Sequence, residues 1–163
     1  MKSLRFSGLL LFCAILVVPA NSVADRPSSE RETIIRSVVD LTNNERAKLG
    51  LPPLTYDKRL EKAAQWMAED MANKGYFSHT DSFGRSVGQR VPTFGYENYA
   101  ILRENLAGGF SSPKEAVDAW MKSPGHKASI LCEKCTNIGV GIHYDPKSKY
   151  GYYWVQEFGT EMR

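Results

Sequence analysis

The first hydrophobic pattern along the chain predicts a long helix. Apolar residues recur at helical spacing from Ile34 to Leu49, and Ser29 can begin a capping box just before them. Gly50 tolerates a positive φ and can end this helix. Residues 51–54 contain two prolines, so we expect them to run extended.

A second helix is predicted between Asp57, which can cap its first turn, and Gly75, which can end it. Its apolar stripe consists of Leu60, Ala63, Ala64, Met67 and Met71. The alanines are small enough to let the helix lie close against a sheet. Trp66 falls off the stripe, and we expect it to pack against the first helix or the N-terminal segment.

The second half of the chain combines one helical region with alternating β patterns. Ser112 can cap a helix that begins at Pro113 and carries Trp120. Apolar and polar positions alternate in residues 137–143 and 150–159, which predicts a hairpin. Residues 104–107 could add a third strand, and we expect residues 76–94 to form a loop with one short helix.

The first 24 residues have the features of a secretory signal peptide. Lys2 and Arg5 precede an apolar run at residues 9–18, and small residues allow cleavage after Ala24. A membrane anchor is the alternative, but the run is shorter than the about 20 residues that a bilayer requires. We therefore predict a signal peptide at 1–24, a linker and helix start at 25–35, and one domain at 36–160.

Export and a balanced charge limit the partners of the mature chain. We expect it to be extracellular, or periplasmic in a Gram-negative cell, with no transmembrane anchor after cleavage. The chain has 21 basic and 18 acidic residues, and two of the basic ones lie in the leader. The mature chain is therefore close to neutral, and we expect no nucleic-acid partner.

Cleavage would remove Cys13 and leave Cys132 and Cys135. Two thiols this close can form a tight disulfide in an oxidising compartment, with inert thiols or a reactive pair as alternatives. A zinc half-site would need a second pair of cysteines, and a thioredoxin-like motif would need a βαβ context.

Three polar residues in turn-rich segments are candidates for a chemical site: His79, Glu104 and His126. Ser123 can cap a short helix with Pro124 and His126 in its first turn, where the helix dipole disfavours imidazolium. Two imidazoles and a carboxylate can hold zinc beside a water molecule, or polarise water for hydrolysis without a metal.

Spacing alone cannot unite these three residues, because none lies within helical reach of another. Taken singly, each histidine is also consistent with a solvated or hydrogen-bonded loop residue. Glu104 could lie on the surface or bind backbone N–H groups.

Five short motifs follow one another along the chain: 77–81 around His79, 104–107 (Glu-Asn-Leu-Ala), 119–126 ending in Pro-Gly-His, 138–141 (Ile-Gly-Val-Gly) and 154–159. In this order they resemble the bacterial branch of the CAP superfamily, which comprises cysteine-rich secretory, antigen 5 and pathogenesis-related 1 proteins and is also called SCP-like. The resemblance covers roughly residues 36–160.

The resemblance implies an α+β fold, in which three to four helices cover both faces of a small, mainly antiparallel sheet as an α-β-α sandwich. It also implies a large cleft that holds a divalent cation, often zinc, with His79, Glu104 and His126 as the matching ligands. The family's second acid would stand at Ser123, so this chain lacks it there. Asp81 could orient His79 from behind.

Three functions are compatible with this resemblance. The first is a secreted, monomeric module that binds a lipid, a small apolar molecule, or a cell-envelope or host partner. The second is a metal-assisted hydrolase or peptidase in which Glu104 is a ligand or the base. The third is a surface interaction protein with a vestigial cleft. We favour binding over catalysis, because no serine or cysteine nucleophile has an identifiable partner and because fold does not fix function.

Overall fold

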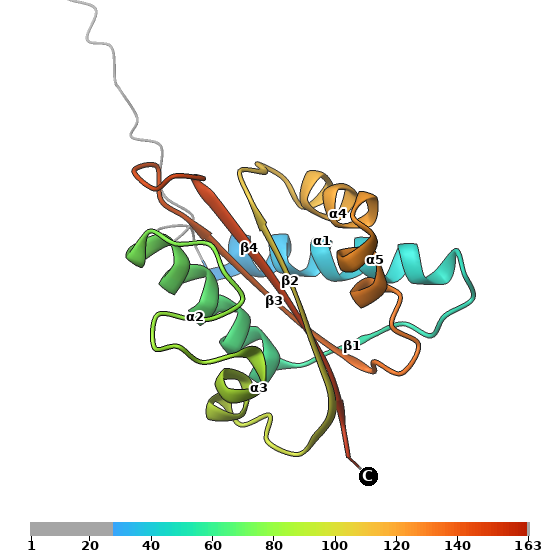
Figure 1. Cartoon of the computed structure of the whole chain (residues 1–163). Coiled ribbons are helices and arrows are strands. Elements are labelled where there is room, and N and C mark those ends of the chain that lie inside the picture. Colours follow the sequence, from blue (N-terminus) through green and yellow to red (C-terminus); the bar gives the residue numbers. More distant parts are fainter. Residues whose placement is uncertain (1–27, 163) are drawn as a thin grey trace, which may run out of the picture.

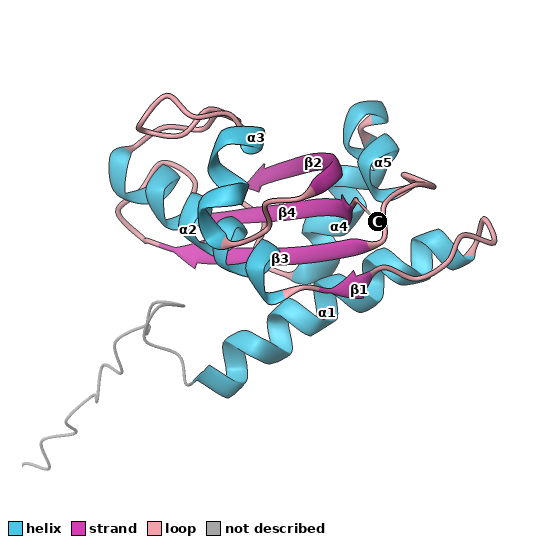
Figure 2. Ribbon diagram, turned by 90° about the horizontal axis from the view of Figure 1, so that it is seen from below, coloured by secondary structure: helices cyan, strands magenta, loops and turns pink. Residues whose placement is uncertain are grey.

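One four-stranded sheet forms the centre of the molecule (Figures 1 and 2). The computed structural model describes residues 28–162, so the predicted signal peptide lies outside the described residues. The strands β1 (Thr55–Tyr56), β2 (Tyr99–Gly108), β3 (Asn137–Tyr144) and β4 (Tyr152–Glu161) lie in the order β1-β3-β4-β2. β1 is parallel to β3, whereas β3 and β2 each pair antiparallel with β4. The predicted hairpin and third strand are confirmed.

Helices cover both faces of this sheet (Figure 1). One face carries α1 (Ser28–Ala47), α4 (Pro113–Lys122) and α5 (Pro124–Ile130). The other carries α2 (Lys58–Lys74) and the short α3 (Val87–Arg90), which continues into a 3-10 turn, η2 (Val91–Phe94). The α-β-α sandwich is therefore confirmed, with two of its five helices only four and seven residues long.

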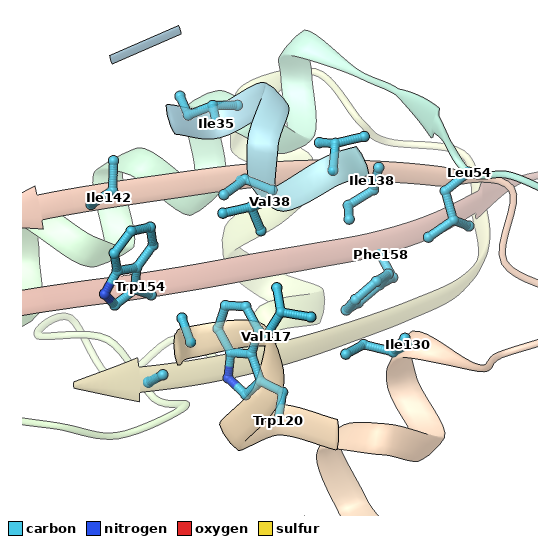
Figure 3. Close-up of a cluster of buried hydrophobic side chains, with 14 of the residues drawn as sticks. Ile35, Val38, Leu54, Val117, Trp120, Ile130, Ile138, Ile142, Trp154 and Phe158 are labelled. Carbon is cyan, nitrogen blue, oxygen red and sulfur yellow. The ribbon is translucent and has the colours of Figure 1, made fainter. Parts of the chain in front are cut away.

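The larger core lies between the sheet and the layer of α1 and α4 (Figure 3). Trp154 and Phe158 of β4 point into this layer, as the alternating pattern predicts. Gln156 lies between them and is buried, but its Nε2 donates to the hydroxyl of Thr42 on α1 at 2.8 Å. Alternation along β4 thus sends every second side chain to the face of α1.

The opposite face brings α2 into backbone contact with β3. A Cβ atom on Gly139 would lie 2.2 Å from the backbone nitrogen of Glu61, and one on Gly141 would lie 2.3 Å from the carbonyl carbon of Ala64. The close approach predicted for the alanine-rich helix is confirmed. Gln65 then bonds both the N–H and the C=O of Ile142, at 3.1 and 3.0 Å, where β1 no longer covers the edge of β3.

Most helix ends follow the sequence signals, but α1 begins at Ser28, one residue before the cap predicted at Ser29. Asp57 accepts a hydrogen bond from Arg59 N at 2.8 Å, and Gly75 ends α2 with φ of 70°. Ser112 accepts from Glu115 N at the start of α4. The side-chain cap predicted for Ser123 is wrong: Ser123 precedes α5 but makes no capping bond with its side chain, and Pro124 opens the helix instead.

Trp66 packs against two aromatic rings of the 76–94 segment. Its ring lies 6.1 Å from the rings of Phe83 and Phe94, measured between centroids, and it lines one pocket together with Arg31 of α1. Sequence spacing does not place the 76–94 segment beside α2, and the predicted contact with the N-terminal segment lies outside the described residues.

Arg46 of α1 anchors the segment that follows α5. Its buried guanidinium donates to the carbonyls of Pro52, Ile130 and Cys132 at 2.8 to 2.9 Å. Cys132 and Cys135 are joined by a disulfide, with their Cα atoms 5.4 Å apart. The small disulfide loop is therefore held to α1 by a buried cation that bonds only backbone carbonyls.

The contact of α2 with β3 can be tested with Gly141→Ala. The added methyl group would meet backbone rather than a movable side chain, so we expect a loss of about 2 kcal/mol or more in the free energy of unfolding. Urea denaturation measures it. Gly125→Ala in α5 is the control, because nothing lies within 4 Å of its added Cβ. Equal stability of the two variants would contradict the close packing.

Candidate functional site

The candidate site lies at the outer edge of β2, which is the edge strand of the sheet between the two helical layers. Glu104 belongs to β2, which has β4 on one side only. His79 lies in the loop between α2 and α3, on one face of the sheet. His126 lies in the first turn of α5, on the other face, and its carbonyl accepts a hydrogen bond from Asn105 Nδ2 at 3.0 Å. The two histidines thus approach one strand from opposite layers.

Glu104 orients His79. Nδ1 of His79 is 2.7 Å from Oε1 of Glu104. The Glu104 side chain is 2% exposed, whereas that of His79 is 61% exposed. A carboxylate on Nδ1 favours the proton at that nitrogen and leaves Nε2 as an acceptor. His79 therefore presents a fixed imidazole to solvent.

Arg90 connects the His79 loop to the sheet. Its Nη2 donates to Oε2 of Glu104, and also to Oε1 of Glu157 at 2.9 Å. Its Nη1 donates to the backbone carbonyl of His79 at 3.4 Å. Arg90 and Glu157 have fully buried side chains. One guanidinium thus holds two acids and the loop that carries a histidine.

The strand register explains why the two acids meet. Glu104 of β2 is directly opposite Glu157 of β4. Cross-strand partners project to the same face, and here that face is the one covered by α2 and α3. Their carboxyl groups therefore share a small buried space that Arg90 enters from α3.

The surroundings of His79, His126, Glu104 and Glu157 shift the pKa values of all four groups. Partial desolvation lowers the pKa of His79 although much of its side chain is exposed, and partial desolvation together with the neighbouring His79 lowers the pKa of His126. Both imidazoles are therefore neutral at pH 7, as expected for His126 from its helix position. Burial raises the pKa of Glu104, and burial with the charge of Glu104 raises the pKa of Glu157 well above its ordinary value.

The structure brings His79, Glu104 and His126 to one place. Asp81 is not part of this group, and the side chain of Ser123 has no role in it. Asp81 is buried, and its carboxylate binds Arg85 Nε and the backbone N–H of Phe83 at 2.8 and 3.0 Å. It therefore shapes its own loop, and the predicted orientation of His79 by Asp81 is wrong. Ser123 donates its backbone N–H to the carbonyl of Trp120 and ends α4.

Sequence reasoning missed Arg90 and Glu157. Glu157 had a detectable signal, since it is a charged residue inside a strand whose neighbours are buried, on the opposite face from Trp154 and Phe158. Arg90 had none, because it lies in a turn-rich segment where arginine is ordinarily exposed.

The three predicted ligands do not fit a divalent cation as they are arranged. Both oxygens of Glu104 have partners, one on His79 and the other on Arg90, and His79 uses Nδ1 for that contact. Among the residues the structure describes, no three His, Cys, Asp or Glu side chains are grouped as metal ligands. Zinc binding therefore stays a prediction for this chain.

Comparison with known proteins defines the family. Residues 39–158 match the model of the cysteine-rich secretory protein family, CAP. The chain therefore belongs to the CAP family, which confirms the resemblance.

Individual relatives agree with this assignment. The chain is 39% identical to the uncharacterized protein YkwD of Bacillus subtilis, over 85% of this chain and 51% of YkwD. An extracellular protein containing an SCP domain from Bacillus anthracis has a similar structure, with a TM-score of 0.73, 26% identity, and coverage of 83% of this chain and 44% of that one. An outer surface protein from Borrelia burgdorferi gives a TM-score of 0.73 and 26% identity, with 84% of this chain and 97% of that one covered. The chain thus spans about half the length of YkwD.

Two of these relatives are described as extracellular or outer surface proteins. Within residues 28–162, no helix is both long enough and apolar enough to cross a membrane.

The buried acid can be tested with Glu157→Gln. The pKa of Glu157 in the folded chain lies well above 4.5, its ordinary value in the unfolded chain. Between these two pKa values the carboxyl is ionised in the unfolded chain but protonated in the folded chain, so folding takes up a proton. Wild-type stability should then fall as pH rises from 4.5 through the folded pKa. Glutamine carries no charge, so Glu157→Gln should flatten this decline and raise stability at neutral pH.

Urea denaturation at a series of pH values measures this slope. Glu133→Gln, at an exposed glutamate, is the matched control and should keep the wild-type slope. An unchanged slope in Glu157→Gln would show that Glu157 is ionised in the folded chain.

Proposed function

We propose that this chain is an extracellular CAP-domain binding module that holds an extended peptide along the outer edge of β2. The observation that carries the proposal is an edge strand, β2, whose outer side has no strand partner among the described residues and which runs between two histidines. The descriptions of the relatives from Bacillus anthracis and Borrelia burgdorferi support an extracellular location.

The backbone groups of β2 that face away from β4 can be identified. The carbonyl of Leu106 accepts a hydrogen bond from Trp120 Nε1 at 3.0 Å, so Leu106 presents its backbone to the outer edge. The N–H of Gly109 donates to the carbonyl of Tyr152 on β4, so the odd-numbered residues of β2 direct their backbone groups toward β4. Leu102 and Glu104 therefore also present N–H and C=O groups outward, because the pattern alternates.

This part of the edge is open to solvent. Arg103 and Ala100 are exposed, and no described element pairs with β2 as a strand on that side. An extended peptide can form backbone hydrogen bonds to such an edge, and nearby pockets or polar groups then select its side chains. Nε2 of His79 and the ring of His126 are placed to make those selective contacts on either face.

The polar groups of the site do not favour a lipid or a small apolar molecule, which is the ligand class that the family resemblance favours. The groups that surround it are imidazole, carboxyl and guanidinium. A groove of about 430 Å³ lies elsewhere, along α2, and is lined by Trp66 and Phe94 together with six charged or polar residues. Substitutions at His79 or His126 should not affect a ligand bound there.

Peptide binding can be measured by screening the mature protein against a peptide array and titrating the hits by fluorescence anisotropy. Leu102→Pro removes one outward N–H, and we expect it to weaken binding about tenfold, the effect of losing one hydrogen bond. Leu102→Ala is the matched control because it removes the side chain but keeps the N–H. His79→Ala and His126→Ala should also weaken binding.

Two results would count against this proposal. If Leu102→Pro and Leu102→Ala bind equally well, the strand edge is not the docking site. If no cleft substitution changes the binding of a natural partner, the interaction uses another surface and the cleft is vestigial.

A second candidate function is peptide hydrolysis, favoured by the hydrogen bond between Glu104 and His79. A carboxylate on Nδ1 orients an imidazole whose Nε2 can take a proton from water, which is the arrangement of a general base. The lowered pKa of His79 keeps this nitrogen unprotonated at pH 7. Metal is not required for this step.

Hydrolysis can be tested by incubating the mature protein with a mixed peptide library and analysing the products by mass spectrometry. If His79 is the base, His79→Ala should abolish cleavage and Glu104→Gln should reduce it by about a hundredfold or more. Cleavage that survives His79→Ala would exclude this site, and a complete lack of cleavage would leave binding as the function of the cleft.

A further inference from the structure

We propose that the guanidinium of Arg90 occupies the electrostatic position of a divalent cation at this site, so that the chain holds its cleft together without a metal. The inference concerns how the site is assembled and stands whether or not a peptide binds there. It begins from the disagreement between the ligand set that the family implies and the contacts that the residues make.

The structure assembles two histidines and two acids, although not from the positions that the sequence indicated. Ser123 stands where a second acid was expected, and Glu157 of β4 places a carboxyl beside Glu104 instead. His79 touches Glu104, and the backbone carbonyl of His126 accepts a hydrogen bond from Asn105, the residue that follows Glu104 on β2. His79, Glu104, Glu157 and His126 are therefore a two-histidine, two-acid set.

Arg90 lies between the two acids of this set. One nitrogen, Nη2, bonds a carboxyl oxygen of each. The side chains of Arg90 and Glu157 are fully buried and that of Glu104 is 2% exposed, so water screens none of these charges effectively. Two buried carboxyls need a cation or protons, and this guanidinium is the cation that the chain provides.

A second cation would be disfavoured at this place for a simple reason. Arginine does not lose its proton in proteins, so its charge cannot be removed to admit a metal. A dication that approached Glu104 would meet this fixed positive charge in a poorly screened environment, where repulsion is strong. Removal of the guanidinium would free the carboxyl oxygens that Arg90 now bonds, one on Glu104 and one on Glu157.

The test is a gain of metal binding in Arg90→Gln. Metal-free mature protein is titrated with ZnCl₂ in a calorimeter, alongside the variant. We expect wild type to show no saturable binding that depends on His79. We expect Arg90→Gln to bind one ion at least about tenfold more tightly than wild type, because a repulsive charge is lost.

Two double variants test whether the four named groups bind the new ion. Arg90→Gln/His79→Ala and Arg90→Gln/Glu157→Gln should each lose the gained affinity. The second also removes one acid together with the cation, so it keeps the buried charge closer to balance and is expected to fold without metal.

Folding is followed by circular dichroism and thermal unfolding with and without zinc, since Arg90→Gln leaves two acids without their cation. If this variant unfolds without metal, zinc should restore its folding, because a ligand that binds only the folded chain stabilises it. Tight zinc binding by wild type through His79 and His126 would overturn the proposal. So would a folded Arg90→Gln without added affinity, or one that stays unfolded at saturating zinc.

Discussion

The contact on which the site depends is the hydrogen bond of one buried guanidinium to two buried carboxyl groups. Arg90 of α3 reaches Glu104 on β2 and Glu157 on β4 and also holds the carbonyl of His79. Without this cation, two acids would face each other in a space that excludes water, at a cost of several kcal/mol. The same guanidinium also fixes the loop of His79 against the sheet. Arg90 therefore both balances the buried negative charge and positions the exposed imidazole.

The layered fold determines where this site can form, because it covers one edge of the sheet and leaves the other partly open. Gly139 and Gly141 let α2 lie on β3 at backbone distance, and Gln65 satisfies the strand edge that β1 leaves uncovered. These contacts close one side of the sheet, whereas β2 at the other side is covered only in part. An edge strand that is left open is a hazard for aggregation unless charge or function protects it. Here the open stretch is short, and it is flanked by His79 from the loop after α2 and by His126 from α5.

Membership of the CAP family establishes the architecture of this chain, but the contacts among its site residues are its own. Ser123 replaces an acid that the family pattern expects, and Glu157 restores one from a neighbouring strand, already paired with arginine. In the proposed arrangement, the guanidinium of Arg90 takes the place of a metal ion between the two acids. This is one way in which a common fold supports different functions.

The sequence by itself determined the elements and their order. Capping at Asp57 and Ser112, the glycine ends at Gly50 and Gly75, and the alternation in β3 and β4 are local features, because each depends on residues a few positions apart. It also identified His79, Glu104 and His126 through short motifs. Only the tertiary structure decided what Glu104 binds, because its partners lie 14, 25 and 53 residues away along the chain. Strand register brought Glu157 opposite Glu104, and the packing of α3 directed Arg90 between them. Neither event leaves a periodic signal in the sequence, since long-range pairing depends on the whole fold rather than on local spacing.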